Sequence, residues 1–118
     1  MNTRLEYLYR DASNFKNLGE IVFAGEFDDA LLNRLRTSFH EGDWFIASQV
    51  RIPDLYFIEY PINDDDHCWH EFSQLTATGD EPNDSEMRTF ADFVLECEQA
   101  RNEGWREFEH QISQTFSN

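Results

Sequence analysis

The chain has 118 residues, the length of one domain, and its 24 acidic side chains outnumber the 9 basic ones, giving a formal net charge of −15. This charge argues against direct binding to nucleic acid or to an anionic membrane. A protein surface that binds either of them needs clustered Lys and Arg, and here these residues are scattered. A disordered acidic polymer is also disfavoured, since 40% of the residues are hydrophobic and 15% are aromatic. We therefore expect one folded acidic domain over residues 1–118.

The first two predicted elements are strands. Residues 5–10 partly alternate, with a leucine and two tyrosines on one face and charged side chains on the other. Residues 20–26 form a second run of β-favouring side chains, and polar turn-forming residues separate the two runs. This pattern predicts a β-hairpin with a long connection.

A helix is predicted next, with Asp28 or Asp29 as its N-cap and Gly42 at its end. Its apolar side chains recur at helical spacing, at Leu31, Leu32, Leu35 and Phe39. The apolar run over residues 44–52 fits either a further helical turn or a buried strand, and we interpret it as irregular. The continuous apolar and aromatic run over residues 55–60 is typical of a central strand.

A polar turn over residues 61–66 leads to a fourth predicted strand, over residues 69–76. A second helix is predicted to begin at Asn83, because Glu86 follows three residues later as in a capping box. Its apolar side chains are Met87, Phe90, Val94 and Cys97.

A further apolar stripe follows Gly104 and consists of Trp105, Phe108, Ile112 and Phe116. One long bent helix and two helices joined at residues 102–104 both fit, because glycine inside a helix costs only about 1 kcal/mol. The element order β-β-α-β-β-α, with this additional C-terminal helix, predicts an α+β fold. Its antiparallel sheet has about four strands and carries the helices on one face.

One segment concentrates side chains that can bind metal: Asp64, Asp66, His67, Cys68, His70 and Glu71. The carboxylates suit Mg²⁺ or Ca²⁺, and the imidazoles and thiol suit Zn²⁺, so a metal-binding protein or a metal-dependent hydrolase is one hypothesis. The spacing matches neither a calcium loop nor a paired zinc motif. The alternative interpretation is a solvated acidic turn followed by a strand with a structural histidine.

Cys68 and Cys97 are expected to be free thiols in a reducing cytoplasm, because no signal-peptide pattern and no membrane-spanning apolar run occurs in the sequence. The sequence also contains no phosphate-binding glycine loop, no nucleophile elbow around a serine and no helical histidine pair. We therefore expect a non-enzymatic chain without a cofactor, unless the acidic segment binds a divalent metal.

The C-terminal half carries most of the charge, since residues 61–118 contain 14 acids and 3 bases, a net charge of −11. Aromatic side chains lie among carboxylates near its end, and this mixture is typical of a surface that binds a basic protein. The residues concerned are Glu103, Trp105, Glu107, Phe108 and Glu109. The sequence thus predicts a protein-interaction domain for a basic partner, in one version a nucleic-acid mimic or inhibitor. In the alternative, the same aromatic residues close the domain's own core.

Overall fold

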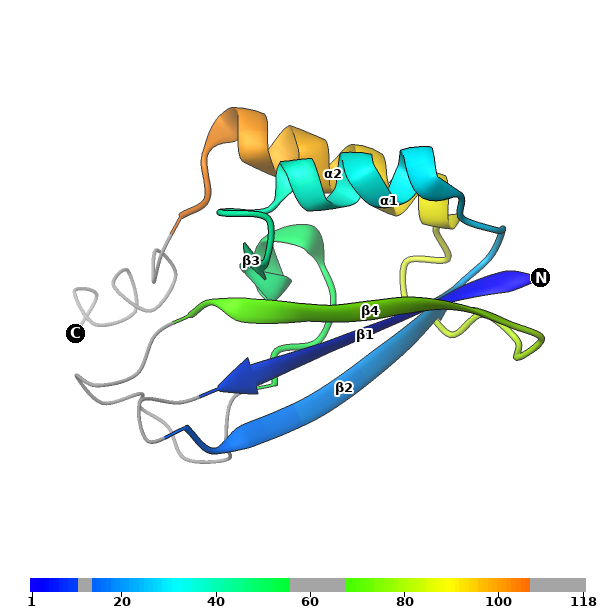
Figure 1. Cartoon of the computed structure of the whole chain (residues 1–118), viewed down its shortest axis with the longest axis horizontal. Coiled ribbons are helices and arrows are strands. Elements are labelled where there is room, and N and C mark those ends of the chain that lie inside the picture. Colours follow the sequence, from blue (N-terminus) through cyan, green and yellow to red (C-terminus); the bar gives the residue numbers. More distant parts are fainter. Residues whose placement is uncertain (11–13, 56–67, 107–118) are drawn as a thin grey trace.

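The computed structural model describes residues 1–10, 14–55 and 68–106, which form an α+β fold (Figure 1). Its elements are, in chain order, β1 (Asn2–Arg10), β2 (Lys16–Phe23), α1 (Asp29–Ser38), β3 (Trp44–Phe45), the 3₁₀ helix η1 (Ala47–Val50), β4 (His70–Thr78) and α2 (Phe90–Glu103). The strands form one antiparallel sheet in the order β2-β1-β4-β3. The predicted fold class and the predicted element order β-β-α-β-β-α are confirmed.

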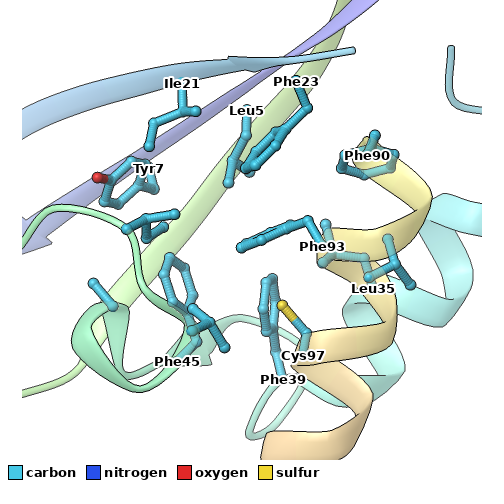
Figure 2. Packing of buried hydrophobic residues seen from close by; sticks show 14 of the residues in the cluster. Leu5, Tyr7, Ile21, Phe23, Leu35, Phe39, Phe45, Phe90, Phe93 and Cys97 are labelled. Carbon is cyan, nitrogen blue, oxygen red and sulfur yellow. The ribbon is translucent and has the colours of Figure 1, made fainter. Parts of the chain in front are cut away.

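Both helices pack on one face of the sheet, as Figure 1 shows, and the core lies between them and the strands (Figure 2). The side chain of Phe23 in β2 stacks on Phe93 in α2, with ring centroids 4.5 Å apart. Phe39, directly after α1, stacks on Phe45 in β3 at 4.7 Å. The buried face of β1 is the one that its alternation predicts, with Leu5, Tyr7 and Tyr9 all buried.

The central strand β1 pairs with β2 on one side and with β4 on the other, and the β4 pairing contains a bulge. Glu6 lies opposite Gln74 and Tyr7 lies opposite Phe72, so Ser73 is the extra residue. An extra residue reverses the alternation of inward and outward side chains. Phe72 and Leu75 consequently both pack against the core, although they are three residues apart.

Strand β2 begins earlier than predicted, because its pairing with β1 extends to Lys16. Gly19 looks like a turn residue in the sequence but lies within this strand. A Cβ added there would come within 2.8 Å of Leu55 Cδ2, so the glycine leaves room for the leucine that crosses this part of the sheet.

Helix α1 begins as predicted and ends earlier than predicted. The Asp28 carboxylate accepts a hydrogen bond from the Leu31 backbone N–H at 2.8 Å, which is an N-cap contact. The last helical residue is Ser38, so the prediction that Gly42 ends the helix is wrong. Glu41 and Gly42 instead form a tight turn, with φ values of 54° and 80°, that leads into β3.

The interpretation of residues 44–52 as irregular is wrong in part, because this run contains β3 and η1. The sequence was ambiguous here because a strand of two residues and a single helical turn are too short to produce a recognisable periodicity of apolar side chains. The predicted strand over residues 55–60 lies outside the described residues from residue 56 onward.

The predicted start of the second helix is wrong, since α2 begins at Phe90 and is capped by Thr89. Asn83 pairs with the free edge of β2, where it accepts from the Val22 N–H and donates its own N–H to the Val22 carbonyl, both at 2.9 Å. Met87, which we predicted on the buried stripe, is 91% exposed. The edge of β2 has backbone groups that no other described strand pairs. Asn83 forms hydrogen bonds with these groups and does not cap a helix.

Helix α2 ends at Glu103, and Gly104 follows with a φ of 96°. The alternative of one long helix through Gly104 is therefore wrong. The predicted apolar stripe lies outside the described residues from residue 107 onward. In the part of the chain that the structure describes, no helix is both long and apolar enough to cross a bilayer.

Candidate functional site

His70 lies in the core at the start of β4, and both of its ring nitrogens bind the main chain. Nε2 accepts from the Leu55 N–H at 2.9 Å, and Nδ1 donates to the Cys68 carbonyl at 3.2 Å. The ring packs between Tyr7 and Tyr9, with centroid distances of 6.1 and 5.3 Å. This bonding selects the neutral Nδ1–H tautomer, so a metal could bind His70 only by displacing a main-chain partner.

The remaining members of the predicted metal cluster are divided between the core, the sheet surface and the undescribed segment. Cys68 is fully buried. Glu71 points to the face of β4 opposite to that of His70 and pairs with Arg10 at 3.4 Å. Among residues 1–10, 14–55 and 68–106, no group of three His, Cys, Asp or Glu side chains could hold a metal ion. The metal site stays a prediction, and outside the described residues lie Asp64, Asp66 and His67.

Zinc titration tests the metal hypothesis directly. We expect Zn²⁺ in small excess over protein to leave the Tm of the metal-free protein unchanged, because the His70 nitrogens are already bonded. A metal that bound the folded protein would raise the Tm progressively with its concentration, because stability would increase by about 2.7 kcal/mol at a hundredfold excess over Kd. Differential scanning fluorimetry with and without chelator measures this. A rise in Tm that His67→Ala removes would establish the site and contradict this expectation.

The buried charges of the described chain gather around Arg88, which uses all five of its N–H donors. Its side chain is 7% exposed and that of Asp84 is 1% exposed. Nε and one terminal nitrogen donate to the two carboxylate oxygens of Asp84, both at 2.9 Å. The other donors bind the Val50 carbonyl at 2.7 Å, the Arg51 carbonyl at 3.0 Å and the Glu96 carboxylate at 3.0 Å. Arg88 thereby joins the segment before α2 to η1 and to α2 itself.

The carboxylates of this network are held ionised. Desolvation of Asp84 favours a higher pKa, but hydrogen bonds from the Arg88 guanidinium and backbone N–H outweigh it, and the pKa lies below its usual range. The pKa of Glu96 is lowered chiefly by its hydrogen bond from Arg51 and further by Arg88. The Arg88 guanidinium also lies over the Phe93 ring, 5.1 Å from its centroid. Because these charges neutralise one another, the network is suited to holding the fold together.

A hollow of about 390 Å³ lies between η1 and α2. Its two arginines are already paired, since Arg51 donates to Glu96 at 2.7 Å and Arg106 lies 3.6 Å from Glu103. Neither arginine is therefore an unpaired cation that would attract an anionic substrate.

Seven of the arginines form ion pairs within the molecule, which leaves the negative charge uncompensated at the surface. These pairs involve Arg4, Arg10, Arg34, Arg36, Arg51, Arg88 and Arg106. Several exposed carboxylates have no ion pair with any described residue: Asp29, Glu41, Glu81 and Asp92. A basic partner would therefore meet carboxylates that need not give up an internal partner.

The three tryptophans of the chain come from distant segments and gather beside the turn that follows α1. The His40 ring stacks on Trp69, with centroids 5.1 Å apart, and Trp69 meets the edge of Trp105 at 6.3 Å. A shallow surface hollow of about 280 Å³ is lined by His40, Glu41, Trp44 and Trp69. We call these four residues the tryptophan hollow. It combines aromatic faces with one exposed carboxylate.

The predicted partner-binding residues are only partly described. Glu103 is exposed at the end of α2, and Gln99 donates to it at 3.1 Å. Trp105 is half-buried against the core, and its indole N–H donates to the Ser38 carbonyl at 3.2 Å. This residue therefore packs on its own domain. The other predicted residues, outside the described part, are Glu107, Phe108 and Glu109.

Neither the Arg88 network nor the tryptophan hollow was predicted from the sequence. Asp84 and Arg88 are four residues apart, a spacing that can indicate an ion pair. We did not interpret it in this way, because we predicted that the segment was an ordinary part of a helix. We took His40 for a residue of a helix, whereas it lies beyond the end of α1. Nothing in the sequence indicates that Trp69 approaches His40, because 29 residues separate them.

Comparison of the chain with models of protein families, with curated proteins and with solved structures finds no significant match in any of the three. The function proposed below therefore rests on the residues and their geometry.

Proposed function

We propose that this chain is a non-enzymatic acidic domain that binds a basic protein partner. The observation that carries the proposal is the distribution of charge: most arginines are paired internally, while several exposed carboxylates have no ion pair with a described residue, on a chain of net charge −15. Such a field attracts a basic surface from a distance and accelerates association, and salt weakens both effects. In one version of the proposal the domain occupies a groove that otherwise binds nucleic acid.

The chemistry of the perturbed groups favours binding over catalysis. Burial raises the pKa of the Cys97 thiol well above its usual range, so this thiol stays protonated at neutral pH and is a poor nucleophile. Burial also raises the pKa of Tyr7, whose hydroxyl donates to the Pro53 carbonyl at 2.8 Å. Catalytic groups are usually tuned toward neutral pH and open to substrate, and these two groups are neither.

Affinity capture from the native lysate tests the proposal. We expect a basic protein to be retained at about 50 mM salt and released at about 500 mM, because salt screens exposed charges. Duplex DNA or RNA should compete with the domain for this partner if the domain is a nucleic-acid mimic. A partner retained equally at both salt concentrations would contradict electrostatic docking.

A variant with fewer charges makes the test specific. Replacing Asp29, Glu41, Glu81 and Asp92 by their amides removes four exposed charges that have no described ion pair, and we expect association with the captured partner to slow by about tenfold. The matched control exchanges Asp and Glu at the same positions, which preserves the charge and should preserve the rate. Equal rates for both variants would contradict the proposal.

A further inference from the structure

The tryptophan hollow has the composition of a site for a cation. Two indole rings, Trp44 and Trp69, line it together with His40, and aromatic faces attract cations, with tryptophan the strongest. Glu41 supplies a full negative charge at the same hollow. It is exposed and has no ion pair with a described residue.

The backbone holds Glu41 in place beside the tryptophan. The His40 N–H donates to the Trp44 carbonyl at 2.7 Å, and the Trp44 N–H donates to the His40 carbonyl at 3.0 Å. Between these residues Glu41 adopts a φ of 54°, a left-handed conformation that Gly, Asn and Asp adopt at lower cost. A glutamate with this strained backbone fits a functional role for its longer carboxylate side chain.

We propose that the tryptophan hollow receives an arginine side chain of the basic partner, an inference that rests on the proposed function. The planar guanidinium stacks on indole faces and pairs with a carboxylate at the same time, and it is less strongly hydrated than an ammonium group. The volume of about 280 Å³ is large enough to admit one arginine side chain. The larger hollow beside α2 is less suitable, because none of the described residues that line it is aromatic and two of them, Arg51 and Arg106, are cations.

The test uses the full-length protein and a peptide of alternating glycine and arginine, with a citrulline peptide as its uncharged analogue. The three indole N–H signals in a ¹⁵N-correlated spectrum come from this one region, so they report directly on occupancy. We expect the Trp44 and Trp69 signals to shift and saturate with the arginine peptide, and the citrulline peptide to leave them unmoved. Indole signals that stay in place at saturating arginine peptide would overturn the proposal.

Matched variants separate the hollow from the general negative charge. We expect Glu41→Gln to weaken binding of the arginine peptide about threefold, and Glu81→Gln, which removes another exposed charge outside the hollow, to change it by much less. Trp44→Leu should weaken it about fivefold, provided that the backbone amide spectrum stays dispersed. Equal losses for Glu41→Gln and Glu81→Gln would contradict a specific site, even if Trp44→Leu failed to fold.

The outcomes also distinguish this inference from the proposed function. If the captured partner binds with the expected salt dependence but is indifferent to Glu41→Gln and Trp44→Leu, electrostatic docking stands and the arginine site is wrong. If neither the partner nor the arginine peptide binds at about 50 mM salt, both are wrong. A lysine peptide that binds as tightly as the arginine peptide would overturn the preference for guanidinium.

Discussion

Arg88→Ala is expected to lower the free energy of unfolding by about 3–5 kcal/mol, the range for removing one partner of a buried ion pair. The substitution leaves the Asp84 carboxylate buried without its bidentate partner. It also removes the donors to the Val50 and Arg51 carbonyls, which join η1 to the segment before α2. Urea denaturation followed by circular dichroism measures the change.

Arg34→Ala is the matched control for this prediction. Arg34 also makes a bidentate pair, with Glu98 at 3.0 and 2.7 Å, and this pair joins α1 to α2. Its side chain is 45% exposed, so we expect a much smaller loss of stability than for Arg88→Ala. Equal losses for Arg34→Ala and Arg88→Ala would show that burial of the Arg88 pair does not determine its contribution.

The pH dependence of the stability of Arg88→Ala gives a second measurement. Asp84 and Glu96 have pKa values below their ordinary values in the folded protein, so protonation favours the unfolded chain. Their contribution to stability is present above about pH 5 and is lost as the pH falls through the folded pKa values. In Arg88→Ala the buried, unpaired Asp84 prefers to be protonated, so the stability gap to the wild type should narrow toward low pH. A gap that stays constant would contradict this account.

His70→Ala is expected to lower the free energy of unfolding by about 3–5 kcal/mol, the range for truncating a large ring in a core. The substitution opens a cavity beside Tyr7 and Tyr9 and removes the hydrogen bonds from the ring to the Leu55 N–H and the Cys68 carbonyl. A buried polar group that loses its partner costs about 1–3 kcal/mol. Thermal and urea denaturation measure the loss.

Two further variants separate the contributions of the His70 ring. His70→Phe fills the same space but cannot bind the main chain, so we expect a smaller loss of about 1–3 kcal/mol. His40→Ala removes an exposed histidine and should change stability by less than about 1 kcal/mol. A His70→Phe protein as stable as the wild type would show that the two main-chain hydrogen bonds contribute nothing.

The fold class, the buried face of β1 and the start of α1 follow from short-range patterns in the sequence. The alternation in residues 5–10 places Leu5, Tyr7 and Tyr9 on one face because successive strand residues point to opposite sides. Asp28 caps α1 because its carboxylate reaches an N–H three residues later. The large negative charge is likewise a property of composition, and the proposed function depends on it.

Only the tertiary structure decided the residues that form the candidate sites. The bulge at Ser73 depends on pairing with β1, and Asn83 binds a strand edge 61 residues away instead of capping a helix. Arg88 finds its carbonyl partners 37 and 38 residues earlier in the chain, and Trp69 reaches His40 across 29 residues. The physical reason is range: hydrogen-bond patterns and amphipathicity act within one or two turns, whereas satisfying buried polar groups and packing rings requires neighbours that folding alone brings together.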